Sequence, residues 1–264
     1  MQLIIYSLLF VYLVGFALLY LLQEKFIFLG DELPADYQYE FKASFEELNL
    51  ENGDAQLNAL HFKADSAKGL ILYFHGNQGN LTRWGNVVIP LIHMGYDVLI
   101  MDYRGFGKSL GKRTQKNLLS DAELFYQYVL KQYAEDQIIL FGRSLGTGLA
   151  SYLAGKHQPA KVILETPYYS MASVGQQLYP IFPVSWAMRF NFKSYDYLKT
   201  ATCPIYIFHG TDDRVVPYAQ GERLFRSLAS SKRQLITIEE GRHKNLADFD
   251  KYWAELSAIL NQKE

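Results

Sequence analysis

Short apolar runs alternate with polar, glycine-rich turns along most of the chain. From residue 70 onward the apolar runs lie at 70–74, 96–101, 137–141, 161–164, 205–208 and 234–238. Runs that are apolar throughout are typical of strands buried on both faces of a parallel sheet. Helical spacing appears between them at residues 83–94, 118–133, 145–156, 218–228 and 246–262. This alternation predicts an α/β fold with a mostly parallel central sheet flanked by helices.

Two stretches of alternating apolar and polar residues precede the first of these runs. They lie at 45–50 and 57–62, on either side of Asn52-Gly53-Asp54, and predict a strand pair joined by a tight turn. Residues 26–44 have the composition of a linker. We therefore expect an N-terminal membrane segment over 1–25, a linker over 26–44 and one α/β domain over 45–264.

The N-terminal segment predicts a membrane helix. Residues 3–22 carry no charge, and at ~1.5 Å per residue they span roughly 30 Å, the thickness of a bilayer's hydrocarbon core. A cleaved signal peptide would have basic residues before a shorter apolar stretch, whereas nothing basic precedes Leu3. We expect an uncleaved single-pass anchor rather than a cleaved signal or a docked helix. Lys25 is the only basic side chain nearby, too little for the positive-inside rule to assign an orientation.

An aromatic-rich insertion interrupts the alternation between residues 167 and 200. Pro180 and Pro183 argue against a single long helix there and favour short helices and loops. Two compatible interpretations remain: a surface excursion around its own small core, and a cap that walls an apolar acyl pocket.

Composition narrows the classes of partner. Lys plus Arg is 26 and Asp plus Glu is 27, so the net charge of -1 gives no general attraction to nucleic acid, and no nucleic-acid partner is expected. The single cysteine, Cys203, excludes a disulfide within the chain and a cysteine-based zinc site. The oligomeric state does not follow from these properties.

The pattern Gly-x-Ser-x-Gly occurs twice, at residues 107–111 and 142–146. A nucleophile elbow needs a strand before the serine and a helix after it. The copy around Ser144 has both, whereas the copy around Ser109 has loop residues on both sides. Residues 107–109 also resemble the end of a phosphate-binding loop, but Asp102 occupies the position where that loop requires glycine. Ser144 is therefore the predicted nucleophile.

A serine nucleophile needs a histidine base and an acid that orients it. His243 follows the last predicted strand on a loop, where sites of such sheets are assembled. His157 ends the helix after Ser144, and His209 precedes the acidic pair, so both fit the role less well. Asp212 and Asp213 follow the strand at 205–208, and the residue pattern does not separate them.

Glu239 and Glu240 are weaker candidates for the acid, because they share a segment with His243. An oxyanion hole needs two backbone amides. Leu145, directly after Ser144, is expected to supply one, and the glycine-rich loop at residues 75–80 is expected to supply the other.

The ordered set of these segments resembles the α/β-hydrolase superfamily over about residues 45–260. The matching segments are 74–79, 102–107, 142–146, 209–217 and His243. Within it, the chain looks like small membrane-tethered hydrolases related to monoacylglycerol lipases and protein depalmitoylases. In that family Gly-x-x-Asp-x-x-Val-Pro carries the acid, so the resemblance selects Asp213. It also implies that Asn77 supplies an oxyanion amide and that residues 102–105 are structural. Arg242 stands where the family commonly has a small residue, and this difference bears on the width of the entrance and so on substrate size.

The resulting expectation is a serine hydrolase that cleaves a carboxylic ester or thioester, with no metal and no organic cofactor. A membrane tether and an aromatic insertion favour a lipid or acyl-protein substrate. An aminopeptidase-like peptidase and a non-catalytic scaffold that keeps the fold are the alternatives. A dehalogenase is disfavoured because such enzymes carry Asp at the elbow, where this chain has Ser144.

Overall fold

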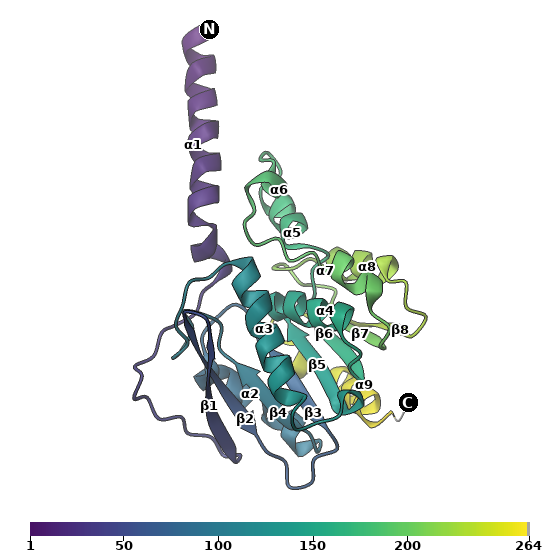
Figure 1. Ribbon diagram of the computed structural model, residues 1–264. Coiled ribbons are helices and arrows are strands. Elements are labelled where there is room, and N and C mark those ends of the chain that lie inside the picture. The colour runs from purple at the N-terminus through teal and green to yellow at the C-terminus, as the bar shows by residue number, and fades with distance from the viewer. Residues whose placement is uncertain (263–264) are drawn as a thin grey trace.

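Eight strands form one sheet in the order β1-β2-β4-β3-β5-β6-β7-β8 in the computed structural model, which describes residues 1–262 (Figure 1). The strands are β1 Phe45–Asn52, β2 Ala55–Phe62, β3 Leu70–Phe74, β4 Asp97–Met101, β5 Ile138–Arg143, β6 Lys161–Glu165, β7 Ile205–Gly210 and β8 Arg233–Ile238. From β4 to β8 every neighbouring pair is parallel, and β2 joins both β1 and β4 antiparallel. With its flanking helices this is the α/β-hydrolase fold, as the sequence predicts.

Helices cover both faces of the sheet. The α-helices are α1 Gln2–Ile27, α2 Leu81–His93, α3 Gln115–Val129, α4 Thr147–Lys156, α5 Met171–Leu178, α6 Val184–Ala187, α7 Ser194–Tyr197, α8 Tyr218–Ser227 and α9 Asp250–Asn261. Short 3₁₀ turns lie at Glu135–Gln137, Ser144–Gly146, Leu198–Thr200 and Leu246–Asp248. Buried side chains of α3, α4 and α8 pack on one face of the sheet, and those of α2 and α9 pack on the other.

Helix and strand boundaries differ from the predicted ones where side chains cap or extend an element. The Asn80 side chain accepts a hydrogen bond from Thr82 N–H, which starts α2 two residues early. Thr114 caps α3 in the same way. β5 runs on to Arg143 because its last residues continue the ladder with β6, where Arg143 lies opposite Glu165.

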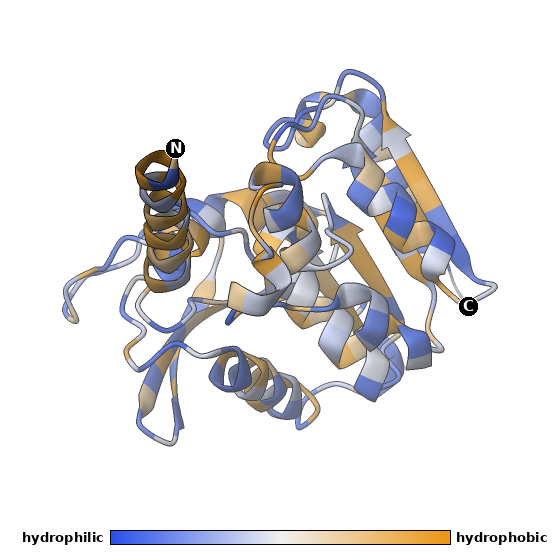
Figure 2. Cartoon of the chain, turned by 90° about the horizontal axis from the view of Figure 1, so that it is seen from above, coloured by the Kyte–Doolittle hydropathy of each residue, from blue (hydrophilic) through white to orange (hydrophobic). Residues whose placement is uncertain are grey.

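The insertion between β6 and β7 forms α5, α6 and α7 above the carboxyl edge of the sheet; we call residues 167–200 the cap (Figure 1). Among residues 1–262, α1 alone is long and apolar enough to cross a membrane, and its apolar stretch is not buried in the protein. Figure 2 shows α1 end-on and hydrophobic along its length. Past α1, Leu29 forms a bridge to Gln78 and Glu32 one to Gly107, so this part of the expected linker lies against the domain.

A buried ion pair fixes the loop at residues 102–107. The Arg104 guanidinium binds both carboxylate oxygens of Asp121 on α3, at 2.7 and 2.8 Å, and both residues are almost fully buried. Asn52 at the end of β1 donates to the same carboxylate at 2.7 Å. This pair therefore ties the loop to α3 and β1 and has the structural role that the family resemblance implies.

Removing Asp121 should destabilise the fold strongly, because the buried Arg104 guanidinium would lose two charged hydrogen bonds and keep only the exposed Asp54 as a charged partner, at 3.1 Å. We expect Asp121→Ala to lower the free energy of unfolding by about 3–5 kcal/mol. The matched control is Glu222→Ala, which breaks the exposed pair with Arg226 and should cost less than about 1 kcal/mol. Denaturant titration of the detergent-solubilised chain, followed by tryptophan fluorescence, measures both. If Asp121→Ala lowered the free energy of unfolding as little as Glu222→Ala, the structural role of the Arg104–Asp121 pair would be contradicted.

Candidate active site

Ser144 lies on a sharp turn between β5 and α4. Its φ of 51° is in the left-handed region, which is uncommon for a residue with a side chain. Gly142 and Gly146 make the turn sterically feasible: a Cβ on Gly142 would lie 2.6 Å from the Gly146 carbonyl oxygen, and one on Gly146 would collide with the Phe74 carbonyl. The turn is thus wedged against the end of β3, and it presents the Ser144 side chain at the carboxyl edge of the sheet.

His243 and Asp213 complete a hydrogen-bonded chain with Ser144. The Ser144 Oγ lies 2.9 Å from Nε2 of His243, and Nδ1 of the same imidazole lies 2.7 Å from Oδ2 of Asp213. The three residues come from three different strand ends: the elbow after β5, the loop after β7 and the loop after β8. The structure therefore brings together the three residues that the sequence analysis selected, and their catalytic role stays a prediction.

The Asp213 carboxylate is held in its charged form. Burial alone would raise its pKa, but hydrogen bonds from His209 and His243 and a backbone hydrogen bond from Val216 outweigh burial, and the pKa lies well below its usual range. The second oxygen, Oδ1, accepts the N–H groups of Val215 and Val216, both at 2.9 Å. A fixed carboxylate of this kind can orient the imidazole and stabilise its protonated form.

The competing residues have other contacts. Asp212 is exposed, and its nearest partner is the hydroxyl of Thr211. His209 binds the Val216 carbonyl oxygen at 2.8 Å and lies behind Asp213, 3.4 Å from Oδ2. His157 pairs with Glu123 of α3 at 2.9 Å. None of these side chains makes a hydrogen bond with Ser144 in the described part of the chain.

Ser109 is also committed elsewhere. Its hydroxyl donates to the Asp102 carbonyl oxygen at 2.9 Å and accepts the Asn58 N–H at 2.8 Å, and the side chain is 1% exposed. The second Gly-x-Ser-x-Gly copy is therefore a tight structural loop, in agreement with its loop context in the sequence.

The loop after β3 passes directly beside Ser144. A Cβ on Gly76 would lie 3.8 Å from the Cβ of Ser144, which places Asn77 at the edge of the site. The Asn77 carbonyl oxygen accepts the Leu29 N–H at 2.8 Å, and its side-chain amide donates to the Ile27 carbonyl oxygen at 3.1 Å. The backbone N–H of Asn77 has no acceptor within residues 1–262. Leu145, the other predicted amide, lies in the 3₁₀ turn directly before α4. That these two amides bind an oxyanion stays a prediction.

Arg143 is a positioning residue that sequence reasoning missed. Its guanidinium pairs with buried Glu165 at 3.0 Å, stacks over Trp84 at 5.5 Å and donates to the Lys244 carbonyl oxygen at 3.2 Å. It therefore connects the elbow to the loop of His243. The variable position of Gly-x-Ser-x-Gly carries no sequence signal for this role. Arg242, by contrast, is exposed, and its backbone N–H donates to Asn245.

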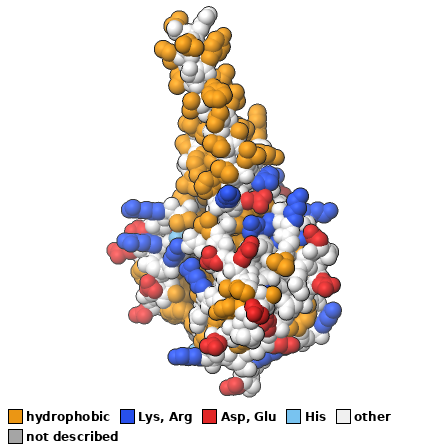
Figure 3. All heavy atoms as spheres, turned by 90° about the vertical axis from the view of Figure 1, so that its left-hand side faces the viewer, with side chains coloured by type: hydrophobic (Ala, Val, Ile, Leu, Met, Phe, Trp, Pro, Cys, Tyr) orange, Lys and Arg blue, Asp and Glu red, His pale blue; other side chains and the backbone are white. Residues whose placement is uncertain are grey.

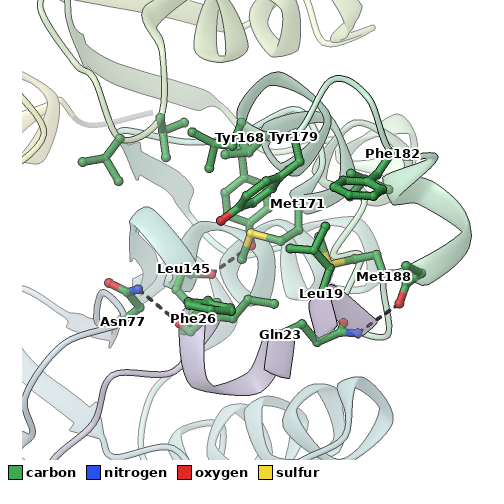
Figure 4. Close-up of a pocket in the computed structure, with 18 of the residues that line it drawn as sticks. Leu19, Gln23, Phe26, Asn77, Leu145, Tyr168, Met171, Tyr179, Phe182 and Met188 are labelled. Atoms are coloured by element: carbon green, nitrogen blue, oxygen red, sulfur yellow. Dashed lines mark hydrogen bonds between the residues drawn. The ribbon is translucent and has the colours of Figure 1, made fainter. Parts of the chain in front are cut away.

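An apolar cavity of about 200 Å³ opens at Ser144. Its walls come from three regions of the chain. The residues are Phe16, Leu19, Gln23, Phe26 and Ile27 of α1; Tyr168, Met171, Val174, Gly175, Leu178, Tyr179, Phe182, Val184, Ala187 and Met188 of the cap; and Asn77, Ser144, Leu145, Val215 and Val216 at the site. Figure 4 shows Leu19 and Phe26 facing Met171, Tyr179 and Phe182 across the cavity. The cap thus walls an apolar pocket, one of the two interpretations of the insertion.

A family model described as "Serine aminopeptidase, S33" matches residues 65–195 and 195–250. The match covers more than half of the chain, so the chain belongs to this family of α/β-hydrolases. The fold and the strand-end site described above agree with that membership.

Individual relatives are distant. The chain is 30% identical over 175 residues to the uncharacterized protein Rv2307c of Mycobacterium tuberculosis, covering 66% of this chain and 62% of the relative. It is 31% identical over 211 residues to the lysophosphatidylserine lipase ABHD12 of Xenopus tropicalis, covering 69% and 53%. The chain thus spans about half to two thirds of these relatives. The Pyrococcus furiosus esterase Pf2001 matches with a TM-score of 0.69 and 16% identity over 86% of this chain and 95% of that one, which shows a shared fold.

Asp213 and its neighbour provide a matched pair of variants. Asp213→Asn should lower kcat/KM for an ester by about 10³- to 10⁴-fold, because the amide would favour the wrong imidazole tautomer. Asp212→Asn should leave kcat/KM within about twofold, since this exposed carboxylate does not reach His243. Steady-state hydrolysis of a chromogenic ester measures both. If Asp212→Asn lowered kcat/KM more than Asp213→Asn, Asp212 and not Asp213 would be the acid that orients His243.

Proposed function

We propose that this chain is a membrane-anchored serine esterase that cleaves a long-chain carboxylic ester or thioester through Ser144, His243 and Asp213. The observation that carries the proposal is the Ser144–His243–Asp213 hydrogen-bonded chain at the floor of an apolar cavity. A lipase among the relatives and an esterase among the solved structures support the reaction class.

The chemistry follows from the geometry. Ser144 Oγ attacks the acyl carbonyl carbon while Nε2 of His243 takes its proton, and Asp213 stabilises the resulting imidazolium. The N–H groups of Asn77 and Leu145 bind the oxyanion of the tetrahedral intermediate. Collapse of the intermediate breaks the bond to the leaving oxygen or sulfur, which takes the proton from His243. Water, deprotonated by His243, then cleaves the acyl-enzyme and restores Ser144.

The cavity favours an acyl chain over a peptide. An aminopeptidase must bind the positively charged amino terminus of its substrate, for which a buried carboxylate is the natural partner. None of the described cavity-lining residues is acidic or basic. The walls are aliphatic, aromatic and methionine side chains with Gln23 and Asn77 as the amides, a surface that suits a hydrocarbon chain. The cavity therefore does not support an aminopeptidase substrate for this chain, although the family model carries that name.

The anchor is the second part of the proposal. α1 has the length and composition of a membrane span, and its N-terminal part projects beyond the domain, which supports an uncleaved helix that holds the enzyme at a bilayer. Figure 3 shows apolar side chains along this helix and charged side chains over the domain below it. Its residues also line the site, and removal by a signal peptidase would open one side of the cavity.

The nucleophile can be tested with a fluorophosphonate probe, which labels activated serines. We expect labelling and ester hydrolysis in the wild type, and loss of both in Ser144→Ala, by at least about 10³-fold in kcat/KM. Ser109→Ala should still be labelled, because Ser109 lies in the structural copy of the motif. Label that persists in Ser144→Ala and disappears in Ser109→Ala would refute the assignment.

Acyl-chain preference tests the substrate class. In detergent micelles we expect kcat/KM for a palmitoyl ester to exceed that for an acetyl ester by about tenfold or more, because each methylene buried in the cavity contributes up to ~0.8 kcal/mol. An aminoacyl anilide should not be cleaved. Strict preference for the acetyl ester, or turnover of the anilide, would contradict the long-chain assignment.

A further inference from the structure

The helix α1 contacts the cap at two places, one near Gln23 and one near Tyr12. At the base, the Gln23 side chain donates to the Ala187 carbonyl oxygen at 3.0 Å and accepts the Arg189 N–H at 2.7 Å. Farther along α1, the Phe182 ring stacks on Tyr12 with 5.0 Å between centroids, next to Gly15, where the missing side chain leaves room for it. The helix and the cap therefore form one packed unit.

In both α1 and the cap, an uncharged stretch ends at residues that lie next to each other in the structure. α1 is uncharged from Leu3 to Gln23, and the cap is uncharged from Pro167 to Met188. The first charged residues beyond these stretches are Glu24 and Arg189, and they form an ion pair at 2.9 Å. Because ionised side chains stay out of hydrocarbon, the level of this pair is where a boundary between water and membrane would lie if both elements entered a bilayer.

The contact between α1 and the tip of the cap lies far from the ion pair of Glu24 and Arg189 along the helix axis. Tyr12, which meets the tip of the cap, lies twelve residues before Glu24, a distance of about 18 Å along the helix axis. One leaflet of the hydrocarbon core is about 15 Å thick. A perpendicular α1 would place the tip of the cap near the middle of the bilayer, and the usual tilt of roughly 20° changes this depth little.

The exposed surface of the cap suits such an environment. Trp186 is 85% exposed and Ile181 is 72% exposed, which in water would be a costly apolar surface. The turn between α5 and α6 also satisfies much of its own backbone. Gln176 donates to the Pro180 carbonyl oxygen and accepts the Val184 N–H. The Tyr12 hydroxyl donates to the Ile181 carbonyl oxygen at 3.2 Å. Internal pairing of backbone groups is what a lipid environment demands.

We propose that the C-terminal half of α1 and the α5–α6 turn lie together in one leaflet, that α1 forms one wall of the acyl site, and that a membrane-resident acyl ester enters sideways between them. The proposal rests on the membrane-anchored esterase described above and deepens it. Phe16 and Leu19 of α1 and Phe182 of the cap line the cavity beyond Glu24 and Arg189, whereas Ser144 lines it from the strand ends of the domain. The acyl chain would thus keep its hydrocarbon surroundings while the ester group reaches Ser144.

Tryptophan fluorescence tests the position of the cap without requiring turnover. α1 contains no tryptophan, and the other two, Trp84 and Trp253, lie in the domain. The full chain is reconstituted in phosphatidylcholine vesicles with or without bromine atoms on the acyl chains, because bromine quenches tryptophan on contact. The emission present in the wild type and absent in Trp186→Phe is assigned to Trp186. We expect brominated lipid to abolish most of that emission. Unquenched Trp186 would overturn the insertion of the cap.

Substitutions at two neighbouring leucines of α1 test whether this helix forms a wall of the acyl site. Leu19 lines the cavity, whereas Leu18 is half exposed and is not among the described cavity-lining residues. Leu19→Trp should fill the cavity and lower the ratio of kcat/KM for a palmitoyl ester to that for a butyryl ester by about tenfold or more. Leu18→Trp should leave this ratio unchanged. If Leu19→Trp does not accumulate as folded protein, Leu19→Ala enlarges the same wall and should move the optimum to longer chains. An unchanged ratio in the folded Leu19 variants would overturn the role of α1.

The outcomes separate this proposal from the function on which it rests. Quenching of Trp186 in a protein that hydrolyses no ester would remove the esterase assignment and keep the membrane arrangement. Ester hydrolysis that depends on Ser144, with unquenched Trp186, would keep the esterase and remove the leaflet route.

Discussion

The left-handed turn at Ser144 is the constraint on which the rest of the site depends. A residue with a side chain in this region carries strain of about 1–3 kcal/mol, which must be offset by the structure around it. Here β5 feeds the turn from the middle of the sheet, and the turn packs against the end of β3 through two glycines that cannot be replaced without collision. Packing of the fully buried central strands stabilises the fold enough to hold this turn in its strained conformation.

This turn decides where every other functional group must lie. Strands β3, β5, β7 and β8 are parallel, so their carboxyl ends meet at one edge. The Asn77 loop, Ser144, Asp213 and His243 each follow one of these ends. Arg143 then connects two of the loops directly, through Glu165 below and the Lys244 backbone beside His243. The loops are therefore held by the sheet's topology first and by side-chain contacts second.

Much of this organisation can be predicted from sequence, because strands buried on both faces leave continuous apolar runs and glycines mark the tight turns. The predicted run at 70–74 coincides with β3, and the others differ by one or two residues at their ends. Asp212 and Asp213 could not be separated by pattern, since adjacent side chains on a loop have no periodicity. The family resemblance favours Asp213, and its contacts with His243 and the Val216 N–H agree with that choice. The role of Arg143 was missed for a different reason: its partners Glu165, Trp84 and Lys244 are remote in sequence.

The N-terminal helix shows most clearly where sequence reasoning ends. Composition identifies a possible membrane span, but a uniformly apolar helix has no face that predicts what it packs against. The exception along its length is Gln23, the one polar amide directly before the charged end, and in the structure this side chain bridges two backbone groups of the cap. Likewise, residues 27–29, expected to be linker, bind the Asn77 loop. Because α1 and the residues directly after it contact both the cap and the loop beside Ser144, a displacement of α1 relative to the domain would change the walls of the cavity and the position of Asn77.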